Sequence, residues 1–349
     1  CDQPGCSLLQ ISQPCIMPHS RVWPLDINLS RFPAIDYLIG YGSGVFRQKG
    51  YEGSRPMVDL VFVVKKAVIV DWHAENLAAH PHHYAPLLRT LGPAAVARFQ
   101  QLGPGLYYNP HVLLETRGGG TLEAKYGVIT AEAMLKDLLN WNWLYLAGRM
   151  HKPCVLEPYG CTGELEKALS TAVATNRQAA LSAAVLLAGW ETNQRGKLSL
   201  WSLWKALVRL SYDGDVRVGV AEDPKKVSNI VSAQADDLLE TYTSYAESLS
   251  VELPALHSCS LDADGSVRFN ATAAGRQRLF EELPLEFQWQ VRNVVGTSIA
   301  PWEDAAALRA VLASTVRRSS LAQTAKGLLT AGASRSLRYG LQKLSKRFK

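Results

Sequence analysis

The chain has 349 residues, 47% hydrophobic and 19% charged, as in a globular protein long enough for two domains. It contains no run of eighteen apolar residues, which excludes a membrane-spanning helix. The net charge of +6 is concentrated at the C-terminus: residues 305–349 contain ten Lys/Arg and no acid, whereas the preceding 304 contain 27 basic and 31 acidic residues. This asymmetry predicts an anionic surface as partner of the C-terminal segment and no nucleic acid as partner of the whole chain.

Residues 1–22 carry only two charged side chains, Asp2 and Arg21, so they do not form a recognisable Arg-rich transit peptide. We expect a disordered leader there. Because the chain begins with Cys1 rather than Met, we expect the natural N-terminus and any targeting signal to lie upstream. The six cysteines show no Cys-x-x-Cys spacing, which argues against a disulfide framework or zinc site and favours a reducing compartment.

A strand–turn–strand unit follows. Residues 37–41 predict a strand, which runs into a turn at Gly42, Ser43 and Gly44, where glycines permit positive φ and close approach of a ligand to backbone amides. Residues 57–64 predict a buried strand that contains Asp59, and an unpaired acid there costs several kcal/mol. This arrangement favours a triphosphate on the turn and Mg²⁺ on Asp59; an ordinary turn is the alternative. The polar loop 47–56 lies beside this site and could cover it.

Residues 72–79 predict a helix, and residues 80–84 a turn broken by proline. Together they contain His73, His80, His82 and His83. No cysteine or acid completes a tetrahedral metal site, so substrate hydrogen bonding, or packing of the helix on the sheet, explains these histidines better.

Residues 102–121 predict glycine-rich loops around one strand, and residues 122–129 a further strand that contains Lys125. Thr130 is a suitable N-cap for a helix over residues 131–146. A basic turn with Arg149 and Lys152 precedes a short strand at 154–156.

The composition then becomes helical. Residues 165–173, 177–190 and 198–210 predict three helices that resemble a helix-turn-helix or winged-helix unit, although Lys205 and Arg209 are the only charges of the last one. Further helices are predicted at 236–253 and 274–295. Directly after the helix predicted at 198–210, Asp213, Asp215 and Arg217 form an Asp-x-Asp turn followed by a cation, which suits a cation or phosphate site. A solvated acidic turn remains equally open.

The C-terminal residues after Gly332 predict a basic amphipathic helix. Its apolar face would contain Leu337, Leu341, Leu344 and Phe348, with basic residues such as Arg338 and Lys343 around it. Such a pattern is typical of a helix lying on an anionic membrane. Docking of this helix on its own domain or on RNA is the alternative.

Many stretches together resemble one family, the mitochondrial phosphatidate cytidylyltransferases, also called mitochondrial translocator assembly and maintenance proteins. The resemblance covers roughly residues 30–349 and excludes the leader. The matching motifs are Tyr-Gly-Ser-Gly-Val-Phe (41–46), Met-Val-Asp-Leu-Val-Phe (57–62), Trp-His-x-Glu-Asn-Leu (72–77), His-Tyr (83–84), Tyr-Tyr-Asn (107–109), Lys-Tyr-Gly-Val-Ile (125–129), Asp-Leu-Leu-Asn-Trp-Asn (137–142), Ala-Gly-Arg-Met-His-Lys-Pro (147–153), Ser-Tyr-Asp-Gly-Asp-Val-Arg (211–217), Glu-Asp-Pro-x-Lys-Val-x-Asn-Ile (222–230), Arg-Arg-Ser-Ser (317–320) and Gln-Thr-x-Lys-Gly-Leu-Leu-Thr-Ala-Gly (323–332).

The resemblance implies Mg²⁺-dependent transfer of a cytidylyl group from CTP to phosphatidic acid, on the matrix face of the mitochondrial inner membrane, as a peripheral protein that supplies cardiolipin synthesis. It also implies an α+β protein. We therefore expect a nucleotidyltransferase domain at 23–160, a winged-helix-like domain at 161–304 and a membrane-associating segment at 305–349.

In this interpretation Asp59 binds the metal, the turn holds the triphosphate, and nearby cations neutralise phosphate oxygens. The expected cations are Lys125, Arg149, Lys152, Arg217 and Lys225. The second strand lacks the usual second carboxylate, since Val61 occupies its position. The candidates to replace it are Asp213, Asp215, Glu222 and Asp223, with Asp137 behind them. A nucleotidyltransferase for a soluble acceptor, RNA or protein, and a non-catalytic assembly factor are the competing interpretations.

Overall fold

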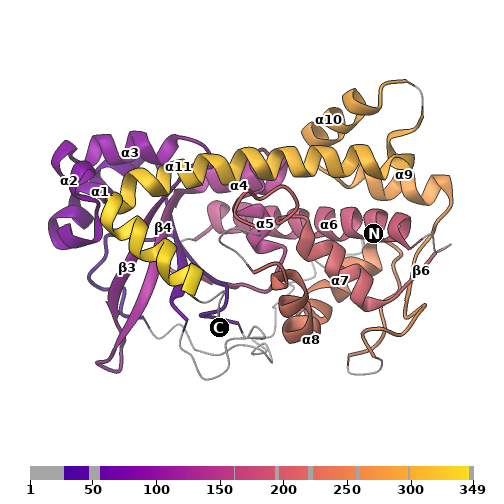
Figure 1. Cartoon of the computed structure of the whole chain (residues 1–349), viewed down its shortest axis with the longest axis horizontal. Coiled ribbons are helices and arrows are strands. Elements are labelled where there is room, and N and C mark those ends of the chain that lie inside the picture. The colour runs from indigo at the N-terminus through magenta and orange to yellow at the C-terminus, as the bar shows by residue number, and fades with distance from the viewer. Residues whose placement is uncertain are drawn as a thin grey trace, which may run out of the picture.

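The computed structural model describes residues 27–46, 56–160, 162–192, 196–218, 223–256, 260–297 and 299–345, and from residue 329 onward only the backbone. The fold is α+β. Helices occupy much of the chain, and the sheet lies toward one end of the molecule, with the later helices toward the other (Figure 1).

The main sheet has five strands in the order β3-β4-β2-β1-β5. They are β1 (Tyr37–Tyr41), β2 (Val58–Val64), β3 (Leu106–Glu115), β4 (Thr121–Thr130) and β5 (Val155–Pro158). Strands β2 and β4 pair in parallel, and the other neighbours are antiparallel, so the sheet is mixed. The central strand β2 is apolar and β-branched on both faces, as expected for a strand that is covered on both sides.

The two faces of the sheet have different covers. One face packs against α1 (Ile69–Ala79) and forms a core with Leu60 and Phe62 of β2. Helices α2 (Pro86–Leu91) and α3 (Pro93–Gln101) follow α1. The opposite face contributes Val61 and Val63 to a larger core that extends into the helical part. Because side chains alternate along a strand, Asp59 lies on this second face.

The histidine-rich segment belongs to the first face. His73 of α1 is fully buried, with Nδ1 at 3.0 Å from the Tyr84 hydroxyl and Nε2 at 2.7 Å from Gln100 Oε1. His83 Nδ1 is 3.0 Å from the Tyr126 hydroxyl, and Asn76 donates to both tyrosines. Burial lowers the pKa of both histidines to about 4, so they are neutral at physiological pH. These contacts pack α1 and the turn that follows it against the sheet, in agreement with one of the two predicted explanations.

Helix α4 (Ala131–Asn140) begins at Thr130, whose hydroxyl accepts a hydrogen bond from Ala133, as predicted. The helix ends six residues earlier than expected because Trp141 adopts a left-handed conformation, with φ of 53°. The carboxylate of Asp137 then accepts hydrogen bonds from the backbone N–H groups of Trp143, Leu146 and Ala147. These hydrogen bonds hold residues 141–146 in a tight loop that leads into the short helix α5 (Ala147–Met150).

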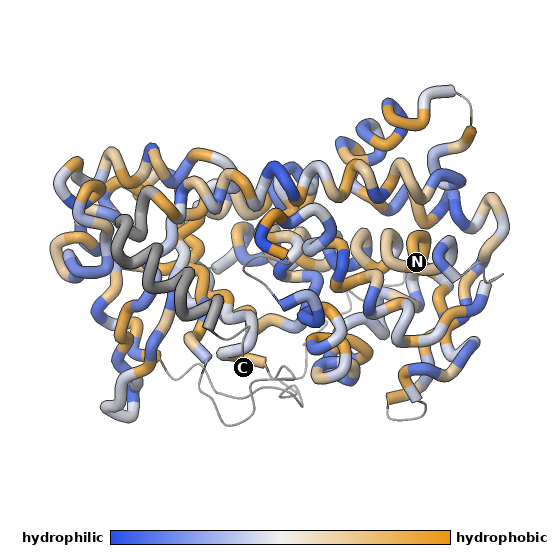
Figure 2. The backbone as a smooth tube through the Cα atoms, viewed as in Figure 1, coloured by the Kyte–Doolittle hydropathy of each residue, from blue (hydrophilic) through white to orange (hydrophobic). Residues whose placement is uncertain are grey.

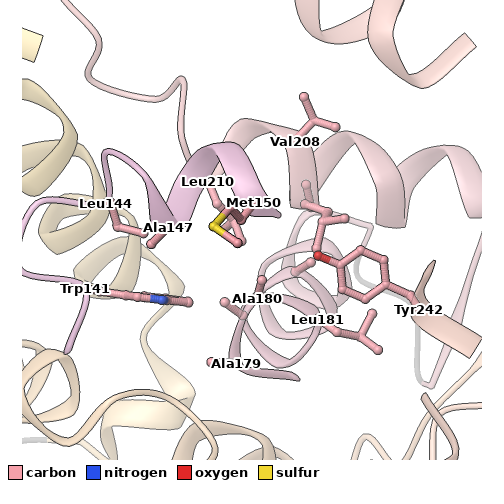
Figure 3. Packing of buried hydrophobic residues seen from close by; sticks show 14 of the residues in the cluster. Trp141, Leu144, Ala147, Met150, Ala179, Ala180, Leu181, Val208, Leu210 and Tyr242 are labelled. Atoms are coloured by element: carbon pink, nitrogen blue, oxygen red, sulfur yellow. The ribbon is translucent and has the colours of Figure 1, made fainter. Parts of the chain in front are cut away.

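The prediction of separate helices at 165–173 and 177–190 is wrong, because one helix, α6 (Glu164–Glu191), spans both. The polar residues between them do not interrupt it. Asn176 is buried, and its Oδ1 accepts a hydrogen bond from the Trp141 indole at 2.8 Å. Figure 3 shows Trp141 and Met150 packed beside Ala179 and Ala180 of this helix.

The remaining helices surround α6. They are α7 (Leu200–Arg209), α8 (Lys226–Ser248), α9 (Ala273–Glu281), α10 (Leu285–Val295) and α11 (Ala305–Ser345). Strands β6 (Lys197–Leu198) and β7 (Val267–Arg268) form a two-stranded antiparallel ribbon. The single helix predicted over 274–295 is two helices, because the chain turns at residues 282–284, which end in Pro284.

Helix α11 runs lengthwise along the molecule from the α9–α10 end to the sheet (Figure 1). Hydrophobic and hydrophilic residues alternate along the part of it that Figure 2 colours. Its inner face includes Leu308, Leu312 and Val316, which are buried in the larger core. Near the sheet, Lys326 Nζ donates to the carbonyl oxygens of Leu102 and Leu106 at 2.8 and 2.6 Å. The helix therefore joins the helical part to the sheet.

Candidate functional site

The candidate site begins at Asp59, the only acidic residue of β2. Its cross-strand partner is Tyr41 on β1 and its parallel partner is Lys125 on β4. Lys125 Nζ lies 3.4 Å from Asp59 Oδ1, and both side chains are about one-quarter exposed, at 23% and 24%. Asp59 is thus not sealed in the core: it is ion-paired and partly open to solvent, which accounts for an acid in this strand.

The glycine turn lies directly against Asp59. Gly42 has a φ of +78°, and its carbonyl accepts hydrogen bonds from the N–H groups of Val45 and Phe46. A Cβ atom on Gly42 would lie 3.1 Å from Asp59 Oδ2, and one on Gly44 would lie 2.5 Å from the Met57 carbonyl. Gly42 therefore provides both the turn geometry and open space beside the carboxylate. Ser43 lies between the two glycines, at the exit of β1.

Three tyrosines that the sequence did not single out line the same face of the sheet. The hydroxyl groups of Tyr41 and Tyr108 are 3.1 Å apart, and Lys125 Nζ lies 4.2 Å from the centre of the Tyr108 ring. Tyr145, from the loop before α5, meets Tyr108 edge to face. The sequence could have revealed Tyr41, because it ends β1 directly before the glycine turn and lies opposite Asp59 in the antiparallel pair. The position of Tyr145 depends on the tertiary fold.

Arg149 of α5 is stacked among these rings. Its guanidinium carbon lies 3.7 Å from the centre of the Tyr145 ring and 5.5 Å from that of Tyr41. Its Nη1 also donates to the Tyr145 carbonyl at 2.5 Å. The stacking fixes a permanently charged planar group beside Asp59's strand partner, a geometry suited to bidentate binding of phosphate oxygens.

The ionisation of these phenols reflects the surrounding charges. Burial and the negative charge of Asp59 raise the pKa of Tyr41. Burial alone would raise the pKa of Tyr145 as well, but the charges of Arg149, Lys125 and Arg217 lower it overall. Three cations therefore act on one phenol, so this face of the sheet has a positive potential that would attract an anionic ligand.

Lys152 provides a further cation after α5. Its Nζ donates to the Gly148 carbonyl and, at 2.7 Å, to the Ser211 hydroxyl. Burial, together with the charges of Arg149 and Lys226, lowers the pKa of Lys152 to about 7. Ser211 and Lys226 belong to the matched motifs, but nothing in their spacing indicated that they lie beside Lys152.

Asp215 and Arg217 form a tight ion pair. Arg217 donates to Asp215 Oδ1 from its backbone N–H at 2.9 Å and from Nε at 3.0 Å, and to Oδ2 from Nη2 at 2.6 Å. The Asp215 side chain is only 3% exposed, and hydrogen bonding to Arg217 lowers its pKa despite burial. Arg149 lowers that pKa too, and Arg217 acts on Tyr145, so this pair belongs to the same electrostatic cluster. Both Asp215 oxygens are engaged by Arg217, which leaves them poorly placed to bind a metal.

Asp213, only two residues earlier, lies in a different charged cluster. Its carboxylate accepts from Arg209, which also contacts Glu191, and Glu191 in turn pairs with Arg309. These residues line a small pocket between α6, α7 and α11. The proposed metal role of Asp213 stays a prediction, and its contacts indicate a structural one.

The other predicted residues are placed as follows. Asp137 caps the 141–146 loop, and Lys225 lies exposed at the start of α8, where its N–H donates to Asp223 at 2.8 Å. Glu222, Phe348 and the loop at 47–55 lie outside the described residues, as do the side chains of Leu337, Arg338, Leu341, Lys343 and Leu344, whose backbone is part of α11. Within the described part of the chain, no three His, Cys, Asp or Glu side chains are grouped to hold a metal ion.

Among the helices in the described segments, none is both long enough and apolar enough to cross a membrane.

Comparison with known proteins gives one consistent family. The family model described as "Phosphatidate cytidylyltransferase, mitochondrial" matches residues 25–346. Similar proteins with this name include one from Schizosaccharomyces pombe, 35% identical over 92% of this chain and 82% of the relative. Those from Drosophila melanogaster and Caenorhabditis elegans are 34% and 32% identical, each over 92% of this chain and over 97% and 96% of the relative. The match thus includes both the sheet and the helical part.

Proposed function

Because the chain belongs to the mitochondrial phosphatidate cytidylyltransferase family, we propose that it transfers a cytidylyl group from CTP to phosphatidic acid. One observation carries this proposal for the site. Asp59 lies beside a glycine turn, and the cations Lys125, Arg149 and Arg217 surround the same face of the sheet. A single carboxylate among several cations suits two substrates that both carry phosphate.

The chemistry requires little from an acid or base. An oxygen of the phosphatidic acid phosphate attacks the α-phosphorus of CTP in line, and the bond to pyrophosphate breaks, which leaves CDP-diacylglycerol. A phosphomonoester is already largely ionised at neutral pH, so it needs no strong general base. Catalysis then consists of positioning and charge neutralisation. Arg149 and Lys152 would bind phosphate oxygens, and Lys125 would neutralise charge beside Asp59.

The donor set fits Mg²⁺. This ion usually takes one or two carboxylates together with substrate phosphates and waters, so Asp59 with the Ser43 hydroxyl could suffice. Gly42 leaves space at Asp59 Oδ2 for such an ion. The bound ion would hold the triphosphate oxygens and offset their charge. A second protein carboxylate is then not essential, which removes the need to recruit Asp213 or Asp215.

We further propose that the two halves of the chain are a nucleotidyltransferase domain and a winged-helix-like domain. The antiparallel β1–β2 pair, with the glycine turn at the exit of β1, supports the first assignment. The β6–β7 ribbon, whose first strand directly precedes α7, supports the winged-helix-like assignment, because it would correspond to the wing.

For location, we propose the matrix side of the mitochondrial inner membrane, where the product would supply cardiolipin synthesis. The relatives are named mitochondrial, and residues 305–349 carry ten basic residues and no acid. The residues after Gly332 would lie on the anionic bilayer with Leu337, Leu341, Leu344 and Phe348 toward the lipid.

The experiment uses purified protein with CTP, Mg²⁺ and liposomes with or without phosphatidic acid. We expect pyrophosphate release and CDP-diacylglycerol only with the lipid, and a loss of at least about 100-fold in kcat for Asp59→Asn. Lipid-independent pyrophosphate release would indicate a soluble acceptor instead. Near-normal turnover of Asp59→Asn would remove Asp59 from the site.

A further inference from the structure

Helix α11 contacts the 141–146 loop, which leads to Arg149 of α5, and the turn that contains Arg217. The first contact involves Arg318. Its guanidinium donates a hydrogen bond to the carbonyl of Asn142 and lies 4.5 Å from the centre of the Trp143 ring. Arg318 therefore binds the 141–146 loop from the side of α11, while the Asp137 carboxylate accepts hydrogen bonds from the backbone N–H groups of the same loop. This loop carries Tyr145 and leads directly into α5.

The second contact involves Ser320, two residues further along α11 and on its buried face. Its hydroxyl accepts a hydrogen bond from the backbone N–H of Val216 at 3.2 Å, and the side chain is only 3% exposed. Val216 lies between Asp215 and Arg217, so this bond fixes the turn at the point where the ion pair forms. The turn also approaches α11 closely at Gly214, where a Cβ atom would lie 2.2 Å from the Ala313 carbonyl.

The two loops meet at the site. Arg149, which follows the first loop, lies on the ring of Tyr145, and Arg217, from the second turn, lowers the pKa of that tyrosine. The two segments are linked directly, because Lys152 after α5 donates to the Ser211 hydroxyl at 2.7 Å. Helix α11, which binds both the 141–146 loop and the turn at Val216, adds a second constraint on their spacing.

We propose that Arg318 and Ser320 are positioning residues for the cytidylyl transfer. Through Asn142, Trp143 and Val216 they hold the guanidinium groups of Arg149 and Arg217 at one fixed separation. The inference rests on the proposed function, because it takes these two arginines to bind substrate phosphates. It assigns a role to the Arg-Arg-Ser-Ser motif, which the sequence alone did not explain.

The physical reason is the sensitivity of phosphoryl transfer to geometry. Misplacement of a substrate-binding group by about 1 Å can cost about 100-fold in rate, even when the change lies away from the reacting atoms. We expect the loss of either α11 contact to allow such a misplacement. Misplacement of the arginines should mainly lower kcat/KM for CTP, because this ratio measures how well the enzyme stabilises the transition state relative to the free enzyme and free substrate.

The chain provides matched controls for both residues. Arg317 is the exposed neighbour of Arg318, so Arg317→Gln removes the same charge from the same surface. Ser314 donates only to Val311 within its own helix, at 2.9 Å, so Ser314→Ala removes a hydroxyl that bridges nothing. Arg318→Lys retains the charge but not the planar group over Trp143.

The experiment measures kcat and KM for CTP at saturating phosphatidic acid, with the melting temperature of every variant. We expect kcat/KM to fall about tenfold or more in Arg318→Gln and Ser320→Ala, with partial recovery in Arg318→Lys, and to stay within about twofold in the two controls. A purely structural role would lower the melting temperature without this selective fall. If Arg318→Gln and Ser320→Ala match their controls in kcat/KM, the proposal is overturned.

Hydrogen exchange supplies a readout that does not depend on activity. Exchange at the Val216 and Arg217 amides should accelerate in Ser320→Ala, and exchange over residues 143–147 in Arg318→Gln, each relative to its control. Unchanged exchange in both segments would overturn the positioning role even if the enzyme is active. An inactive wild-type protein would instead contradict the proposed function, and the exchange data would still decide the positioning role.

Discussion

Lys152 Nζ donates a hydrogen bond of 2.7 Å to the Ser211 hydroxyl, which joins the turn after α5 to the turn after α7. Gly148 makes this junction possible, since a Cβ atom there would lie 2.5 Å from Ser211 Cβ. The contact places Lys152, which follows α5, against Ser211 of the helical part. It also buries that lysine beside Arg149, and the proximity of these two cations has a measurable consequence.

CTP binding should weaken as the pH rises above neutrality. The pKa of Lys152 is lowered to about 7, so the free enzyme loses this charge as the pH increases through that value. Phosphate groups favour the ammonium form, so binding must restore the proton, and KM for CTP should rise by up to about tenfold per pH unit above 7. Lys152→Gln cannot titrate and should show a higher KM at pH 7 with a flat profile. Parallel profiles for the two proteins would contradict this assignment.

Asp213 and Asp215 should behave differently although they are two residues apart. Asp213→Asn removes an ion pair with Arg209 whose partners are about one-third exposed, so we expect at most about 1 kcal/mol of stability loss and near-normal kcat. Asp215→Asn frees Arg217 and should raise KM for CTP. Urea unfolding and steady-state kinetics separate the two effects. A change in the Mg²⁺ concentration dependence for either variant would instead support its role as a metal ligand.

Gly42→Ala tests the space beside Asp59. The residue has a φ of +78°, and the new methyl group would lie 3.1 Å from Asp59 Oδ2. Gly92→Ala is the matched control, because Gly92 has a φ of +84° with no atom within 4 Å of the added Cβ. Both variants should lose about 1–3 kcal/mol of stability from backbone strain, measured by urea unfolding. Only Gly42→Ala should lose kcat, by about tenfold or more; equal kcat in both would show that the contact is unimportant.

Removal of the residues after Gly332 tests the membrane-associating segment. The truncated chain lacks six basic residues and the predicted apolar face, so its flotation with cardiolipin-rich liposomes should decrease strongly. A full-length variant with Leu337, Leu341 and Leu344 replaced by Ser retains the charge. Its binding should persist at low salt and fall at high salt, because electrostatic attraction alone is screened. Unchanged flotation of the truncated chain would exclude this segment as the membrane contact.

The sequence by itself determined the strand–turn–strand unit, because glycine chemistry and the alternation of apolar residues are local signals. The cap at Thr130 and the family assignment rest on such signals or on contiguous motifs, whereas the order of the strands in the sheet does not. Asp59 could be identified for the same reason: a lone acid in an apolar strand is visible without any tertiary information.

Only the tertiary structure decided what surrounds Asp59. Tyr41, Tyr108, Tyr145 and Arg149 come from separate elements, and their convergence depends on how α5 docks on the sheet. Local patterns also misjudged α6, because the polar break at Asn176 is satisfied by Trp141, 35 residues earlier. Long-range partners of this kind determine whether a polar residue ends a helix, or whether a carboxylate binds a metal or an arginine. They follow from packing, which local periodicity does not encode.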